Sequence, residues 1–185
     1  MDLRVERTKK SIKEAFLKLR AEKPLEKITV KELAEQAFIN KATFYSHYKD
    51  IYDLSEQLEN EVINSITENF PTPENLIFNA RENVKTIAKV VMQKKEILDI
   101  LFSGNREVIL EHRLEESISN RICEKYPKLK DDLPGKIVLS MLLRGGFYVF
   151  SQYGEKYDVD DLMRTIGDIN ECLVENFIKV LEDKK

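Results

Sequence analysis

The sequence predicts an all-α protein of about nine helices, in which a three-helix head precedes a longer helical body. Two observations predict this class. The 185 residues include only five prolines and six glycines, and these separate long segments whose apolar residues recur at steps of three and four. Hydrophobic residues make up 42% of the chain, which is enough for a buried core, and charged residues make up 34%.

Four helices are predicted in the first 70 residues. An apolar face that includes Ile12, Phe16 and Leu19 indicates the first helix. A residue suited to capping a helix N-terminus precedes each of the other three. Glu32 follows Thr29 at the spacing of a capping box. The capping residues are Thr29, Asn40 and Asp50, and the predicted ranges are 4–21, 30–37, 41–48 and 51–69.

Five further helices are predicted after the break at Pro71-Thr72-Pro73. The last one carries an apolar seam at steps of three and four, which is typical of helix–helix association. We place a boundary near residue 49, with residues 51–69 as the connector between head and body. The predicted body helices are 73–92, 94–102, 106–125, 132–153 and 158–182, and the seam holds Val159, Leu162, Ile166, Ile169, Leu173, Phe177 and Val180.

The second and third predicted helices form a close pair with a polar outer side. Small Ala34 at the expected crossing point lets the two helices approach. A major groove is about 12 Å wide and accepts one α-helix, so hydrogen-bond donors on a short helix suit DNA recognition. An ordinary helical hairpin with solvated polar residues is the alternative. The outward side chains are Lys41, Thr43, Tyr45, Ser46 and His47.

This segment resembles the tetracycline-repressor (TetR) family of bacterial transcriptional regulators. The resemblance covers about the first 55 residues, and Thr43-Phe44-Tyr45 followed two residues later by an aromatic residue is its most specific part. Beyond that segment, only the length, the helix pattern and the terminal amphipathic helix are similar. Other matching positions are Ile12, Ala15, Phe16, Leu19, Ile28, Thr29, Val30, Leu33, Ala34, Ala37 and the run Lys41 to Lys49.

The resemblance implies a homodimer that binds a palindromic operator in double-stranded DNA and leaves it when a small-molecule effector binds. Residues 1–49 would form the helix-turn-helix DNA-binding domain, and residues 50–185 the ligand-binding and dimerisation domain. The last two helices would form the dimer, with Leu162, Ile166, Ile169, Leu173 and Phe177 at its interface. The implied DNA contacts are Thr29, Asn40, Lys41, Ala42, Thr43, Tyr45, Ser46, His47 and Lys49, with Thr29 and Lys49 at phosphates.

Two positions depart from the family pattern. The turn before the third helix usually begins with glycine, and this chain has Phe38 there. A positive φ at a non-glycine residue costs about 1 kcal/mol or more. A second lysine commonly follows Lys49 by two residues, and this chain has Ile51. Loss of one phosphate contact would lower the salt slope by about one unit.

The pocket of the body is assigned to six candidate residues, for each of which plain core packing is the alternative. Arg144 is the most informative, because it lies in an otherwise apolar segment and a buried arginine needs an anionic partner. That partner would be an internal carboxylate or a ligand carboxylate. The six candidates are Met92, Phe102, Met141, Arg144, Tyr148 and Tyr153.

Composition also bears on the other classes of function. Residues 1–50 hold 12 Lys and Arg against 8 Asp and Glu, a net +4, whereas the remainder is −7. This distribution fits a DNA-facing head on an acidic body. The sequence has no metal-ligand spacing, phosphate loop or nucleophile motif, so we expect no enzyme activity, catalytic residues, metal or cofactor. We expect a cytoplasmic protein without membrane partners, and a helical protein-interaction module with a vestigial head as the alternative function.

Overall fold

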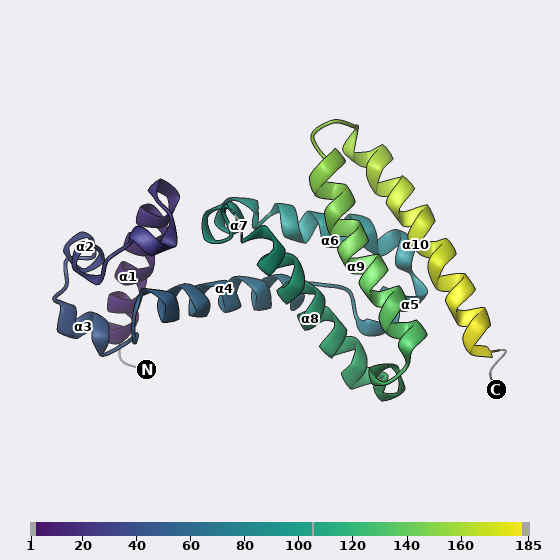
Figure 1. Ribbon diagram of the computed structural model, residues 1–185, viewed down its shortest axis with the longest axis horizontal. Coiled ribbons are helices and arrows are strands. Elements are labelled where there is room, and N and C mark those ends of the chain that lie inside the picture. The colour runs from purple at the N-terminus through teal and green to yellow at the C-terminus, as the bar shows by residue number, and fades with distance from the viewer. Residues whose placement is uncertain (1–2, 105, 183–185) are drawn as a thin grey trace. The chain divides into compact units, whose positions relative to one another are not determined.

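The computed structural model confirms the all-α class (Figure 1). It describes residues 3–104 and 106–182, and it leaves out the side chains of residues 77–78, 107 and 176–182. Among these residues there are α-helices and two short 3₁₀ helices but no strand. The elements are α1 (Leu3–Glu22), η1 (Leu25–Lys27), α2 (Val30–Gln36), α3 (Lys41–Tyr45), α4 (Ile51–Thr67), α5 (Pro73–Phe78), α6 (Ala80–Met92), α7 (Lys95–Leu101), α8 (Glu107–Lys125), η2 (Pro127–Lys130), α9 (Leu133–Tyr153) and α10 (Val159–Glu182).

The chain forms two compact units. The first unit contains residues 1–64 and 94–107, and the second contains residues 65–93 and 108–185. The division falls inside α4 and so does not coincide with the predicted boundary at residue 49. The segment 94–107, which the sequence analysis placed in the body, belongs to the first unit because α7 packs against α1.

The first unit has a closed apolar core. Phe16 of α1, Leu33 of α2, Phe44 of α3 and Leu54 of α4 are fully buried. Each large apolar side chain moved out of water contributes about 1.5–3 kcal/mol to folding. The apolar residues that recur in the sequence at steps of three and four therefore lie on the helix faces that pack together.

A buried charged cluster lies in the same unit. Glu59 of α4 has 0% relative exposure, and it accepts hydrogen bonds from Ser55 at 2.8 Å and from Arg106 Nη2 at 2.6 Å. Arg20 of α1 is also buried and donates to the carbonyl oxygens of Lys23 and Ser103. Burial and the nearby Arg106 lower the pKa of Arg20. The cluster connects α1, α4 and the segment before α8 inside one unit.

The second unit packs α6, α9 and α10 together. Val84, Met163 and Ile166 form its buried cluster, with Phe150 packed against them. Gly167 permits the close approach of α10 to α6, since a Cβ there would lie 2.9 Å from the carbonyl oxygen of Arg81. The Arg81 guanidinium bridges to Asp168 at 2.8 Å and to Glu171 at 3.6 Å across the same contact.

The predicted helix 73–92 is two helices, α5 and α6, separated at Asn79. Asn79 Nδ2 donates to the side chain of Asn75 at 3.0 Å, and Asn83 donates to the Asn75 carbonyl. Asparagine side chains at steps of four compete here with the backbone for hydrogen bonds, which ends one helix and starts the next.

Helix α9 is apolar yet poorly covered. Of its residues only Gly135 is buried, and Leu133, Ile137, Met141 and Tyr148 are exposed along one side. By length and composition alone, α9 is long and apolar enough to cross a membrane, and it is the one such helix among the described residues. The sequence analysis expected no such segment. Lys136 and Arg144 within it explain the difference, because they interrupt any continuous apolar run.

Candidate nucleic-acid interface

The turn between α2 and α3 is a Schellman motif with Phe38 at the position that usually holds glycine. Phe38 N–H donates to the Glu35 carbonyl at 3.3 Å, and Ile39 N–H donates to the Ala34 carbonyl at 2.9 Å. The φ of Phe38 is +55°, the only positive φ of a non-glycine residue in the described chain, and its side chain is 95% exposed. Two possibilities were open for this turn, a different shape or a positive φ tolerated at Phe38, and the structure shows the second.

Hydrogen bonds from α1 and the caps fix the place of the turn and of α3. Ser11 Oγ donates to the Ala37 carbonyl at 2.9 Å, which ties α1 to the end of α2. Thr29 caps α2 by accepting from Glu32 N–H at 3.3 Å. The Glu32 carboxylate does not complete a capping box, because it pairs with Lys23. Asn40 caps α3 by accepting from Thr43 N–H at 2.7 Å, as predicted.

Helix α3 is shorter than predicted. It ends at Tyr45 rather than near residue 48. His47 N–H and Tyr48 N–H both donate to the Phe44 carbonyl, at 2.9 and 3.0 Å, so the last turn tightens before α4 begins. Buried Phe44 anchors the helix from inside, with ring centroids 5.5 Å from Tyr45 and 5.6 Å from Tyr48.

The predicted DNA-contacting residues fall into two groups. The first group is Lys41, Ala42, Tyr45 and Lys49, which are exposed, and the structure brings the first three together on α3. The second group uses its polar atoms in local bonds or is partly covered. Thr43 Oγ1 donates to Asn40 at 2.9 Å, Ser46 Oγ donates to the Thr43 carbonyl at 2.7 Å, Thr29 and Asn40 serve as caps, and His47 is half-buried.

The start of α4 explains why position 51 holds isoleucine rather than lysine, and it bears on a phosphate contact by Lys49. Ile51 is buried in the core of the first unit, so a lysine at that position would lose its apolar packing. Asp53 accepts a hydrogen bond from Lys49 N–H at 2.8 Å. Bonds from Gln57 and from the Lys49 backbone lower the pKa of Asp53, so its carboxylate stays charged beside Lys49. This carboxylate weakens any attraction of Lys49 for phosphate.

The six candidate pocket residues are not brought together, and none of them lines the two adjoining cavities of the second unit. Phe102 is buried in the first unit, and Met92, Met141, Tyr148 and Tyr153 are exposed. Arg144 is exposed as well, contrary to the expected burial, but its internal carboxylate partner is present. It pairs with Glu115 of α8. Burial raises the pKa of Glu115, but hydrogen bonds from Ser140 and Arg144 outweigh it and leave the pKa low.

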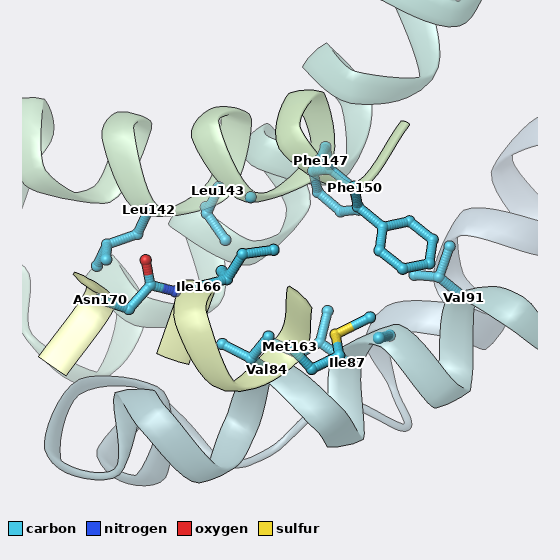
Figure 2. Close-up of a pocket in the computed structure, with 12 residues that line it drawn as sticks. Val84, Ile87, Val91, Leu142, Leu143, Phe147, Phe150, Met163, Ile166 and Asn170 are labelled. Carbon is cyan, nitrogen blue, oxygen red and sulfur yellow. The ribbon is translucent and has the colours of Figure 1, made fainter. Parts of the chain in front are cut away.

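The structure places a cavity elsewhere in the second unit, between α6, α9 and α10 (Figure 2). Its volume is about 80 Å³. Figure 2 shows Asn170 beside Leu142 at one end and Phe150 near Val91 at the other. Sequence reasoning missed these residues because apolar side chains at helical spacing have the same pattern in a core and in a cavity wall. The lining residues are Val84, Ile87, Ala88, Val91, Leu142, Leu143, Gly146, Phe147, Phe150, Met163, Ile166 and Asn170.

The seam residues predicted at the dimer interface divide between two environments. Ile166 is buried, and Leu162 packs against the cluster that contains it, so both serve the core of the second unit. Ile169 is 56% exposed, and Leu173 is half-buried. The side chain of Phe177 lies outside the described residues. Apolar residues with this spacing drift around a straight helix and occupy more than one face. Some of them therefore pack in the core, and others remain exposed.

Comparison of the chain with family models, curated proteins and solved structures found no match.

Proposed function

We propose that the protein is a dimeric transcriptional regulator of the tetracycline-repressor type that binds double-stranded DNA through α3. The observation that carries the proposal is the short, doubly fixed helix α3. Asn40 caps it at one end, Phe44 anchors it in the core, and Lys41, Ala42 and Tyr45 face solvent together. A rigid helix with exposed donors on a closed core is the element that enters a major groove in helix-turn-helix proteins.

Within this proposal the side chains have different roles. Lys41 is suited to base recognition, since a lysine at the start of a recognition helix can donate to guanine O6 and N7. Tyr45 offers a hydroxyl to phosphate or base, and Ala42 permits close approach. Thr43 and Asn40 maintain the helix end rather than read bases, because their polar atoms already bond each other. Phosphate contacts then fix the register of the helix on the duplex.

Dimerisation through the last two helices is supported by the exposed side of α9. Ile137, Met141 and Tyr148 are spaced so that they lie on one side of the helix, and all are at least half exposed. A lipid-facing role for this side is disfavoured by Arg144, which is charged, exposed and midway along the helix. A second copy of the chain would cover the stripe and hold two heads about 34–36 Å apart, the spacing of successive major grooves.

Release of DNA by an effector is the regulatory part of the proposal, and such a protein acts as a repressor in the cytoplasm. Any ligand that binds two arrangements of the dimer with different affinity shifts their populations. A change of a few ångströms in the distance between the two heads is enough to prevent one head from entering its major groove.

The DNA-binding part is tested by fluorescence anisotropy with duplexes from the region upstream of the protein's own coding sequence. We expect specific binding that weakens as salt increases. Lys41→Ala should weaken binding by about 1–3 kcal/mol and relax the preferred sequence at one position. Lys85→Ala, an exposed lysine of α6 in the second unit, is the matched control and should leave affinity unchanged. Equal affinity of the Lys41 variant and the native chain would refute the assignment of α3.

The dimer is tested by sedimentation of two methionine variants. Met141 of α9 is 53% exposed and Met92 of α6 is 48% exposed, so they are matched in type and exposure. We expect Met141→Lys to give monomers and Met92→Lys to remain dimeric. Monomers of the native chain at micromolar concentration would instead favour the helical protein-interaction module, in which the exposed stripe of α9 receives another protein.

A further inference from the structure

The cavity between α6, α9 and α10 adjoins a second one of about 50 Å³. Five residues line both: Val84, Ile87, Leu142, Leu143 and Asn170. The two cavities therefore share part of their walls. All of these residues belong to the second unit.

The lining specifies the chemistry of a ligand. No charged side chain lines either cavity in the described chain. An ionised ligand would consequently be desolvated without an opposite charge, which is strongly unfavourable. Asn170 is the only polar side chain lining the larger cavity, and no hydrogen bond joins its amide to another described side chain. Its amide can donate and accept, so one hydroxyl, carbonyl or amine on the ligand would find a partner.

Gly146 leaves open space at the cavity wall. A Cβ built on Gly146 meets no atom within 4 Å, although the residue lies in the middle of α9. Unfilled apolar space costs stability because the lining atoms lose contacts. A ligand of suitable shape recovers those contacts.

We propose that this cavity is a binding site for a small, uncharged, mainly apolar molecule with a single hydrogen-bonding group that contacts Asn170. Its volume of about 80 Å³ is well below the roughly 300–1,000 Å³ of pockets for drug-sized ligands, so it suits a small molecule. Binding itself is independent of DNA. Its role as the effector site rests on the proposed function.

Phenol is a suitable probe ligand. Benzene is the control that lacks a polar group, and benzoate is the control that carries a charge. Methionine-methyl NMR of the full chain reads the site directly, because Met163 lines the cavity whereas Met92 and Met141 are exposed and line neither cavity. We expect phenol to shift the Met163 signal in a saturable way and to leave the other two unchanged. Benzene should bind more weakly, and benzoate should not bind.

Two adjacent glycines give a matched pair of variants. Gly146→Leu fills the cavity, whereas Gly145→Leu adds the same side chain where a Cβ also meets no atom within 4 Å but outside the cavity lining. We expect Gly146→Leu to weaken phenol binding by at least about tenfold and Gly145→Leu to leave it within about twofold. Asn170→Leu should remove the preference for phenol over benzene while retaining the binding of benzene.

An absent or unsaturable Met163 shift, or equal shifts at all three methionines, would overturn the proposal. So would an unchanged affinity in the folded Gly146→Leu variant. These results are separate from the anisotropy assay. If phenol binds but Lys41→Ala leaves DNA affinity unchanged, the DNA-binding assignment fails and the ligand site stands. If DNA binding depends on Lys41 but Met163 does not respond, only the ligand site fails.

Discussion

The first unit buries charge, whereas the second unit exposes apolar surface. Within the first unit, Arg20 donates a hydrogen bond to the Lys23 carbonyl and Arg106 donates one to the buried Glu59. In the second unit Ile137 and Met141 lie at the surface of α9, and a cavity remains between α6, α9 and α10. The second unit thus exposes a row of apolar side chains along one helix, whereas the core of the first unit is closed and the exposed Phe38 lies in a turn. This difference fits the proposed function, in which the first unit binds DNA and the second receives partners.

The largest expected effect comes from breaking the buried pair. Arg106→Ala removes an arginine that compensates the fully buried Glu59 carboxylate, which should lower the free energy of unfolding by about 3 kcal/mol. Arg144→Ala breaks the more exposed pair with Glu115 and should cost less than about 1 kcal/mol. Urea titration of the full chain measures both. Similar costs for the two variants would remove the contrast between the units.

A smaller effect concerns the contact of α6 with α10. Gly167→Ala would bring a Cβ to 2.9 Å from the Arg81 carbonyl and should destabilise the second unit by about 1–3 kcal/mol. Gly145→Ala meets no atom within 4 Å and should instead stabilise α9 by up to about 1 kcal/mol, since alanine favours the helix. Thermal unfolding of both variants should show shifts of opposite sign. Two shifts of the same sign would contradict the close approach.

The strained turn of the first unit should respond to glycine. Phe38→Gly relieves the positive φ and should stabilise the chain by about 1 kcal/mol. Phe38→Ala removes the ring but keeps a Cβ in the left-handed region, so it separates backbone strain from loss of the side chain. We expect the glycine variant to melt at a higher temperature than the alanine variant. Equal melting temperatures would show that the turn stores no strain.

The smallest expected effect is a pH dependence at the junction of α3 and α4. Burial and the nearby Glu61 and Asp53 raise the pKa of Tyr48 above 10.0. The unfolded chain ionises this phenol first, so the contribution of Tyr48 is present below pH 10.0 and is lost as pH rises through the folded pKa. Tyr48→Phe should reduce the loss of stability between about pH 9 and pH 11, and exposed Tyr52→Phe should not. An equal slope in both variants would exclude Tyr48 as the group responsible.

The sequence by itself determined the features that depend on neighbouring residues. Capping needs only a side-chain oxygen a few residues before an N–H, so Thr29, Asn40 and Asp50 were predicted and are observed. The apolar period placed Phe16, Leu33 and Phe44 in the core because a helix presents every third or fourth residue to one side. The sequence did not decide whether Phe38 would adopt a positive φ or the turn would change shape, and the structure shows the positive φ.

The tertiary structure decided which apolar faces are covered. Helix α9 is mostly apolar and carries only two charged residues, so its sequence could not show that Leu142 and Phe150 face the cavity while Met141 and Tyr148 remain exposed. Arg144 was expected to be buried for the same reason. Burial depends on contacts between segments far apart in the chain, such as α6 with α10 and α1 with α7. Periodicity fixes a face, and only packing determines what lies against it.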